Sequence, residues 1–355
     1  MEQVLQNYRE RILSAGETSQ PLRWRGGGSK DWYGQSLQGE IVDTREWRGI
    51  TDYEPTELVV TARCGTPLAE LEATLAAQGQ MLAFEPPHFG PDATVGGMVA
   101  CGLSGPRRQA VGAVRDFVLG AVLMDGRGEV LHFGGKVMKN VAGYDVSRAL
   151  AGSLGTLGLI LEVSLKVLPL PYAESTLSLA MSEAEALQAL NAWGGQPLPI
   201  SASVWQAGSL LVRLSGAMAA VSAAIARIGG ATIENGPAMW AALREQQVAF
   251  FLDAAQEGRS LWRLSVPSAT PPLALSGEQL IEWGGAQRWL KTDAPAAQIR
   301  ATVTQVGGHA TVFSSADAGV DVFHPLAPAF ERIQRRLMAS FDPAGVFNRG
   351  RMYRN

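Results

Sequence analysis

The chain has 355 residues, of which 46% are hydrophobic and 18% charged, and its formal net charge is −3. These values are typical of a folded protein with two domains and exclude a disordered chain. The slightly acidic balance argues against nucleic acid as a partner. No apolar run approaches the about 20 residues of a membrane span. The N-terminal residues also lack the apolar core of a secretion signal, which favours a cytoplasmic protein.

The first half of the chain predicts alternating helices and strands. Residues 2–14 are expected to form a helix, and a second helix should follow Thr66-Pro67 and end by Gly79. Runs of β-branched and apolar residues predict strands over 57–62, 117–124, 129–133 and 157–168.

Pro169 and Pro171 mark a change in the pattern. Residues 172–325 combine a strand near 209–214 with alanine-rich helices near 182–193 and 217–228, and we expect a second domain there. The tail, residues 326–355, is expected to contain a basic amphipathic helix. It is followed by many turn-forming residues between Phe341 and Arg351. The sequence therefore predicts an α+β protein with domains at 1–171 and 172–325 and an ordered C-terminal segment at 326–355.

Two glycine-rich stretches, residues 25–30 and 94–108, are the strongest functional signal. Consecutive glycines let successive N–H groups point into one concavity, which binds an anion. Serines and basic residues in both stretches add donors and positive charge. Two such loops indicate a large phosphate-bearing ligand, a dinucleotide, held from both sides; two flexible surface turns are the alternative.

Other nucleotide motifs fit poorly. A Rossmann fingerprint needs a third glycine where Asp31 stands, and a P-loop needs Gly-Lys-Ser/Thr, whereas Gly28-Ser29-Lys30 reverses that order. Two cysteines are fewer than the about four thiolates of an iron–sulfur cluster. The four histidines are scattered, and no metal site is expected. Redox chemistry in this chain would therefore need an organic cofactor.

The ordered set of motifs resembles the FAD-binding fold of the vanillyl-alcohol oxidase / p-cresol methylhydroxylase superfamily. The set comprises residues 25–30, 95–105, 115–120 and 155–160, together with Asp342-Pro343 and Asn348-Arg349-Gly350. Three further segments, 85–88, 139–145 and 307–311, are similar to those of the FAD-binding subunits of bacterial glycolate oxidases (glycolate dehydrogenases). That resemblance extends over nearly the whole chain and implies a two-subdomain FAD-binding fold with an α+β cap.

The resemblance implies an FAD site made mainly of the two glycine-rich loops. The residues expected to contact FAD are Arg25, Gly26, Gly27, Gly28, Ser29, Lys30, Pro87, Thr94, Val95, Gly96, Gly97, Ala100, Ser104, Gly105, Arg107, Arg108, Gly155, Gly158, Ile160 and Asn348. Many superfamily members tether FAD through a histidine near the first loop. Ser29 and Lys30 stand there instead, so the expected FAD is noncovalent.

The resemblance further implies an FAD-dependent oxidoreductase subunit of a multi-subunit complex that oxidises glycolate, a small 2-hydroxy acid, to glyoxylate. Catalytic relatives carry a histidine-rich metal motif, whereas this chain has His309 followed by Ala310-Thr311. His309 is therefore only a weak candidate for the base, and the catalytic residues stay unknown. Sibling flavoprotein and iron–sulfur subunits are the expected partners, with peripheral attachment to the inner membrane through the complex. The alternatives are a non-catalytic, flavin-bearing structural or docking subunit and a self-sufficient 2-hydroxy acid dehydrogenase.

Overall fold

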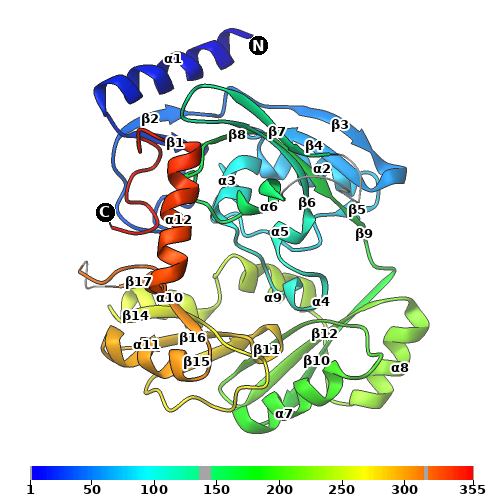
Figure 1. Ribbon diagram of the computed structural model, residues 1–355. Helices are drawn as coiled ribbons and strands as arrows, with labels where there is room; N and C mark the ends of the chain where they lie inside the picture. Colours follow the sequence, from blue (N-terminus) through cyan, green and yellow to red (C-terminus); the bar gives the residue numbers. More distant parts are fainter. Residues whose placement is uncertain (1, 136–144, 316–318, 355) are drawn as a thin grey trace. The chain divides into compact units, whose positions relative to one another are not determined.

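The computed structural model describes residues 2–135, 145–315 and 319–354 (Figure 1). The chain forms two compact units that interleave along the sequence. The first contains residues 1–104, 112–170 and 325–355, and the second contains residues 105–111 and 171–324. The assignment of the predicted segments to an FAD-binding domain and a cap stays a prediction.

The first unit is built on a five-stranded antiparallel sheet with the strand order β3-β4-β8-β6-β7. Its strands are β3 (Ile50–Glu54), β4 (Val59–Arg63), β6 (Val118–Met124), β7 (Val130–Gly134) and β8 (Leu159–Lys166). The three central strands are rich in Val, Leu and Ile and are largely buried, whereas the edge strands β3 and β7 are more exposed. The strands predicted at 57–62, 117–124, 129–133 and 157–168 are confirmed, with shifted ends.

Short strands and helices complete the described part of the first unit. They are β1 (Leu22–Arg25), β2 (Glu40–Asp43), β5 (Gln80–Met81), β9 (Leu168–Pro169), α1 (Glu2–Thr18), α2 (Leu68–Ala76), α3 (Val95–Cys101), α5 (Val114–Phe117), α6 (Val146–Ala149) and α12 (Pro328–Phe341). Strands β1 and β2 pair in parallel. The predicted helix at 2–14 is confirmed and continues to Thr18.

The second unit holds an eight-stranded antiparallel sheet with the order β13-β10-β12-β11-β15-β16-β14-β17. Its strands are β10 (Ala173–Ala180), β11 (Ile200–Gln206), β12 (Ser209–Gly216), β13 (Ala231–Ile233), β14 (Ser260–Ser265), β15 (Glu278–Glu282), β16 (Gln287–Thr292) and β17 (His309–Ser314). Its helices are α4 (Arg108–Val111), α7 (Glu183–Gly194), α8 (Met218–Ile228), α9 (Gly236–Arg244), α10 (Ala249–Gln256) and α11 (Ala296–Gln305).

Helix α7 begins where the sequence supplies a capping box. The Ser182 hydroxyl accepts from the Glu185 N–H at 3.4 Å, and the Glu185 carboxylate accepts from the Ser182 N–H at 2.8 Å. These bonds satisfy N–H groups that a helix start leaves without partners. The helices predicted near 182–193 and 217–228 are confirmed. In the part of the chain that the structure describes, no helix is both long and apolar enough to cross a membrane.

The C-terminal tail returns to β1, where Phe347 forms a parallel β-bridge with Leu22. Leu22 donates its N–H to Val346 O at 2.8 Å, and Asn348 donates its N–H to Leu22 O at 2.8 Å. Asp342 fixes the preceding turn, because its carboxylate accepts from the Phe347 N–H at 2.7 Å. The turn-forming residues of the sequence therefore form turns on both sides of a short contact with β1.

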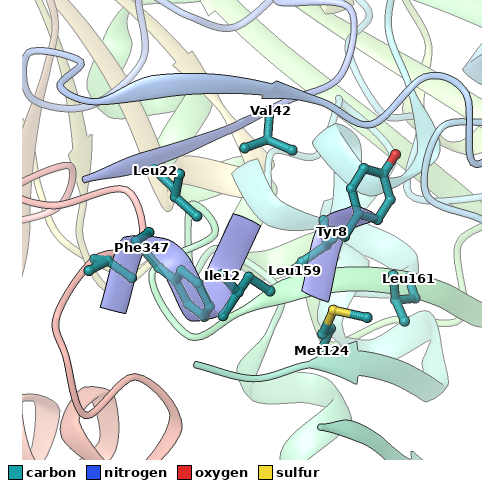
Figure 2. Packing of buried hydrophobic residues seen from close by; sticks show 10 residues of the cluster. Tyr8, Ile12, Leu22, Val42, Met124, Leu159, Leu161 and Phe347 are labelled. Atoms are coloured by element: carbon teal, nitrogen blue, oxygen red, sulfur yellow. The ribbon is translucent and has the colours of Figure 1, made fainter. Parts of the chain in front are cut away.

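An apolar cluster joins α1, β1, β2, the central strands β6 and β8, and the tail (Figure 2). Ile12 on α1 is fully buried, as is Val346 of the tail, and Leu22 of β1 is only 2% exposed. Figure 2 shows Tyr8 and Ile12 of α1 among the labelled side chains of Leu22, Val42, Leu159 and Phe347. The cluster therefore depends on residues from both ends of the chain.

Ile12→Ala should lower the free energy of unfolding by about 2–5 kcal/mol, because it removes buried methyl groups and leaves a cavity. The matched control is Leu13→Ala on the same helix, where the side chain is 41% exposed and the change should stay near 0.5 kcal/mol. Urea unfolding followed by circular dichroism measures both. Equal effects of the two substitutions would contradict the packing of α1 in this cluster.

Candidate functional site

One pocket in the first unit gathers most of the predicted contact residues. About 790 Å³ of space outside the protein atoms lies in this pocket, and part of that space is open solvent. It is lined by Trp24, Arg25, Gly26, Gly27, Gly28, Ser29, Lys30, Asp31, Leu37, Thr44, Cys64, Thr94, Gly96, Gly97, Ala100, Cys101, Leu154, Gly155, Gly158, Leu159, Ile160, Asn348 and Arg351.

The first glycine loop leaves β1 at Arg25 and forms one wall of this pocket. Among the described residues, no protein acceptor is bonded to the backbone N–H groups of Gly26, Gly27, Gly28 and Ser29. Gly28 has a φ of +75°, a left-handed conformation that lets neighbouring amides turn to one side. Backbone N–H groups that lack partners are costly unless water or a ligand satisfies them, so this wall is suited to an anion.

Positions 26 and 27 require glycine for a second reason, besides the room that a ligand needs. A Cβ on Gly27 would lie 1.6 Å from the carbonyl oxygen of Asp92, and a Cβ on Gly26 would lie 2.2 Å from Oγ1 of Thr94. The loop therefore needs these glycines to pack against the chain itself. By contrast, a Cβ on Gly97 would meet only Oγ1 of Thr94, at 3.1 Å.

The second glycine stretch differs from the expected anion nest, because residues 95–101 form helix α3. The Val95 N–H donates to Thr66 O and the Gly96 N–H donates to Cys64 O. The Gly97 N–H donates to Oγ1 of Thr94 at 3.3 Å, which caps the helix. Since these amides already have partners, the stretch offers the pocket a face of small residues, Gly97, Ala100 and Cys101, rather than N–H donors.

A third wall comes from residues 154–160 and the tail. Gly155 has a φ of +73°, and a Cβ there would lie 2.6 Å from Nδ2 of Asn348. Asn348 is 9% exposed; its Oδ1 accepts from the Trp24 N–H at 2.9 Å and its Nδ2 donates to Leu154 O at 2.6 Å. Asn348 thereby joins two walls of the pocket.

Six predicted contact residues are not among those lining the pocket. Pro87 and Val95 are buried, and the Ser104 hydroxyl accepts from the Val114 N–H at 3.1 Å. Gly105, Arg107 and Arg108 belong to the second unit.

The two arginines have protein partners within that unit. Arg107 pairs with Glu174 at 2.8 Å, and the Arg108 guanidinium lies 4.2 Å from the ring centroid of Trp283. Of the motif at 139–145, residues 139–144 lie outside the described residues.

Several lining residues were not predicted from the sequence, among them Trp24, Asp31, Cys64, Cys101 and Arg351. Asp31 accepts from Arg23 at 2.5 Å and from Arg25 at 2.8 Å, which holds both guanidinium groups beside the loop. The indole N–H of Trp24 is buried and has no acceptor within the described chain. A signal for Arg351 existed, since it stands three residues after Asn348 in the same turn.

Both cysteines of the chain line the pocket, and burial governs their chemistry. It raises the pKa of Cys64 to about 12. It also raises the pKa of Cys101, although the charges of Lys30 and Arg351 oppose that shift. Both thiols therefore stay protonated at neutral pH and are poor nucleophiles.

His309 is the first residue of β17, in the second unit, and is exposed. Partial shielding from water, the charge of Arg263 and the imidazole of His324 lower its pKa. A neutral imidazole can accept a proton, as a general base must, but its role stays a prediction. Within the described residues, no three His, Cys, Asp or Glu side chains form a group that could hold a metal ion.

Comparison with known proteins decides the family. The FAD binding domain family matches residues 7–134, which include both glycine stretches. The chain is 49% identical over 344 residues to glycolate oxidase subunit GlcE of Escherichia coli, covering 97% of this chain and 96% of that protein. The chain belongs to the GlcE family of glycolate oxidase subunits.

Shorter similarities link this GlcE-family chain to other proteins. It is 38% identical over 163 residues to D-lactate dehydrogenase of Archaeoglobus fulgidus, covering 44% of this chain and 35% of that protein. It is 31% identical over 140 residues to glycolate oxidase subunit GlcD of Bacillus subtilis, covering 39% and 29% of the two chains.

A solved alkyldihydroxyacetonephosphate synthase has the same fold, with a TM-score of 0.65 at 15% identity over 96% of this chain and 74% of that one. With the FAD binding domain match, this confirms the predicted α+β fold class of the vanillyl-alcohol oxidase / p-cresol methylhydroxylase type.

Gly97→Leu should weaken FAD binding by about 10- to 100-fold, because forcing extra atoms into a filled site costs about 1–3 kcal/mol. The fold should survive, since the added Cβ meets only Thr94. Gly194→Leu is the control, at a glycine with no atom within 4 Å of an added Cβ. Flavin fluorescence titration gives the dissociation constants, and a Gly97→Leu protein that binds FAD as tightly as the control would contradict this site.

Gly27→Ala should instead disrupt the loop itself, because its Cβ would overlap the Asp92 carbonyl oxygen.

Proposed function

We propose that this chain is the FAD-binding subunit of a multi-subunit glycolate oxidase complex that oxidises glycolate to glyoxylate. The observation that carries the proposal is the near full-length similarity to the relative named glycolate oxidase subunit GlcE. The pocket in the first unit supports it, because its unpartnered amides, its small residues and its positive charges fit a large phosphate-bearing cofactor.

In this proposal, residues 1–171 and 326–355 form the FAD-binding domain and residues 172–325 form the cap. The grouping of the tail with the first compact unit supports that division. The amides of Gly26, Gly27, Gly28 and Ser29 would hold the diphosphate, because close backbone approach and N–H donors suit phosphate oxygens. The small face of α3 and the apolar side chains of Leu154, Leu159 and Ile160 would pack against the rest of the cofactor.

We propose noncovalent attachment of FAD. The first loop carries Ser29 and Lys30 and no histidine. The two thiols in the pocket are held protonated by burial, which makes them poor candidates for a tether. The Lys30 ammonium group donates a hydrogen bond to the His88 carbonyl oxygen at 3.0 Å. This bond holds the positive charge of Lys30 at the pocket wall.

When bound, the flavin would supply hydride acceptance, taking two electrons from a substrate or a neighbouring subunit. Two cysteines cannot ligate a cluster of four thiolates, so an iron–sulfur subunit would carry electrons onward. A sibling flavoprotein is the better candidate for binding the 2-hydroxy acid, and His309 is a weak candidate for a base in this chain. The complex would be cytoplasmic and peripheral to the inner membrane.

The purified protein should be yellow, with about one FAD per chain that acid or heat releases. The expectation follows from the anion-binding first loop, which has no histidine, and from the protonated thiols among the described residues of the pocket. Absorption spectra before and after denaturation measure the ratio. Flavin that stays with the polypeptide through denaturing electrophoresis would refute noncovalent attachment, and a colourless protein that does not take up added FAD would refute the cofactor assignment.

The isolated subunit should not turn over glycolate at a useful rate, and activity should appear when the partner subunits are added. Glycolate-dependent reduction of an artificial electron acceptor measures this, with the assembled complex as the control. The alternative of a purely structural flavin predicts that the complex keeps its activity when FAD binding to this subunit is abolished. Steady turnover by the lone chain that His309→Ala removes would overturn the proposal and identify His309 as the base.

A further inference from the structure

Arg351, in the C-terminal tail, is buried in the wall of the pocket and is only 6% exposed. Its guanidinium donates to the carbonyl oxygens of three residues of the first loop region: Asp31 at 2.8 Å, Lys30 at 3.4 Å, and Gln35. The Gln35 N–H in turn donates to Arg351 O at 2.9 Å. The tail and the loop are therefore joined in both directions.

The charge of Arg351 has no carboxylate partner within ion-pair distance among the described residues. The neighbouring carboxylate, Asp31, is shared by Arg23 and Arg25. Burial lowers the pKa of Arg351, but an arginine stays protonated in proteins. A buried charge is costly unless an opposite charge compensates it, and the open side of this region is the pocket.

We propose that Arg351 is an anion-binding and positioning residue of the cofactor site. It holds the carbonyls of residues 30, 31 and 35, so that the loop keeps its amides at 26–29 available, and its charge is compensated by the diphosphate of the ligand. This inference rests on the FAD binding in the proposed function. Arg351 would then be a residue of the cofactor site that lies more than 300 positions away in sequence from the loop it positions.

The proposal separates two contributions that one substitution would mix. The planar guanidinium donates hydrogen bonds to three carbonyl oxygens and so fixes the geometry of the loop. Lysine can reproduce these hydrogen bonds only in part. The charge, which Asp31 offsets only in part, is an electrostatic contribution, which lysine preserves. Comparing Arg351→Lys with Arg351→Gln therefore distinguishes charge from geometry.

The test measures FAD dissociation constants at low and high salt for wild type, Arg351→Gln, Arg351→Lys and the control Arg354→Gln, an exposed arginine of the same tail. Arg351→Gln should weaken FAD binding by about 30-fold or more, and the loss should persist at high salt, because salt screens a buried charge only weakly. Arg351→Lys should recover most of the affinity, and Arg354→Gln should match wild type. Circular dichroism of the apo proteins establishes that each is folded.

A second measurement covers the case in which Arg351→Gln does not fold. Inorganic pyrophosphate should raise the unfolding temperature of the apo wild type and of Arg354→Gln, because a ligand that binds the folded state stabilises it. Absence of any shift in the apo wild type would overturn the proposal.

Three outcomes of the titrations are decisive. Arg351→Gln that binds FAD like wild type would refute the inference alone. Arg351→Lys as weak as Arg351→Gln would refute the role of charge. Wild type that does not bind FAD would refute the proposed function itself.

Discussion

Asn348 bonds three segments that are far apart in sequence: β1, the turn at Leu154 and the C-terminal tail. Its φ of +40° is a conformation that asparagine tolerates better than most residues. The carbonyl of Leu154 and the N–H of Trp24 are backbone groups that would otherwise be buried without partners, at a cost of about 1–3 kcal/mol each. The first glycine loop continues directly from β1, so the position of that loop depends on these bonds.

The two glycine-rich stretches contribute to the pocket in different ways. In the first, glycines pack tightly against Asp92 and Thr94 on one side, and the N–H groups on the other side have no protein partner. In the second, Thr94 begins a helix whose first amides are bonded to the chain. The first stretch therefore offers hydrogen-bond donors to the pocket, and the second offers a surface of small residues.

Local patterns in the sequence predicted the elements well, because each depends on neighbouring residues. Leu68, Leu71 and Leu75 recur at helical spacing and are all fully buried on α2. The β-branched runs likewise became β4 and β8. Asn348 and Gly155 were assigned to the site from motif resemblance, and both line the pocket.

The remaining features depend on partners that local patterns do not reveal. Arg107 pairs with Glu174, a residue 67 positions away, and the segment at 105–111 joins the second unit. The N–H groups of Val95 and Gly96 donate to the carbonyl oxygens of Thr66 and Cys64, which belong to a different segment. The Arg351 guanidinium donates hydrogen bonds to backbone carbonyls about 320 positions earlier in the sequence. Such pairings arise only once the chain is folded.

Hydrogen exchange at single-residue resolution tests the central claim, that the first loop supplies the donors for the cofactor. The apo protein should exchange the amides of Gly26, Gly27, Gly28 and Ser29 rapidly, and FAD should slow them strongly. The amides of Val95, Gly96 and Gly97 should already be slow without FAD, since they have protein partners. Slow exchange at 26–29 in the apo protein, or new protection that appears only at 95–97, would contradict this account.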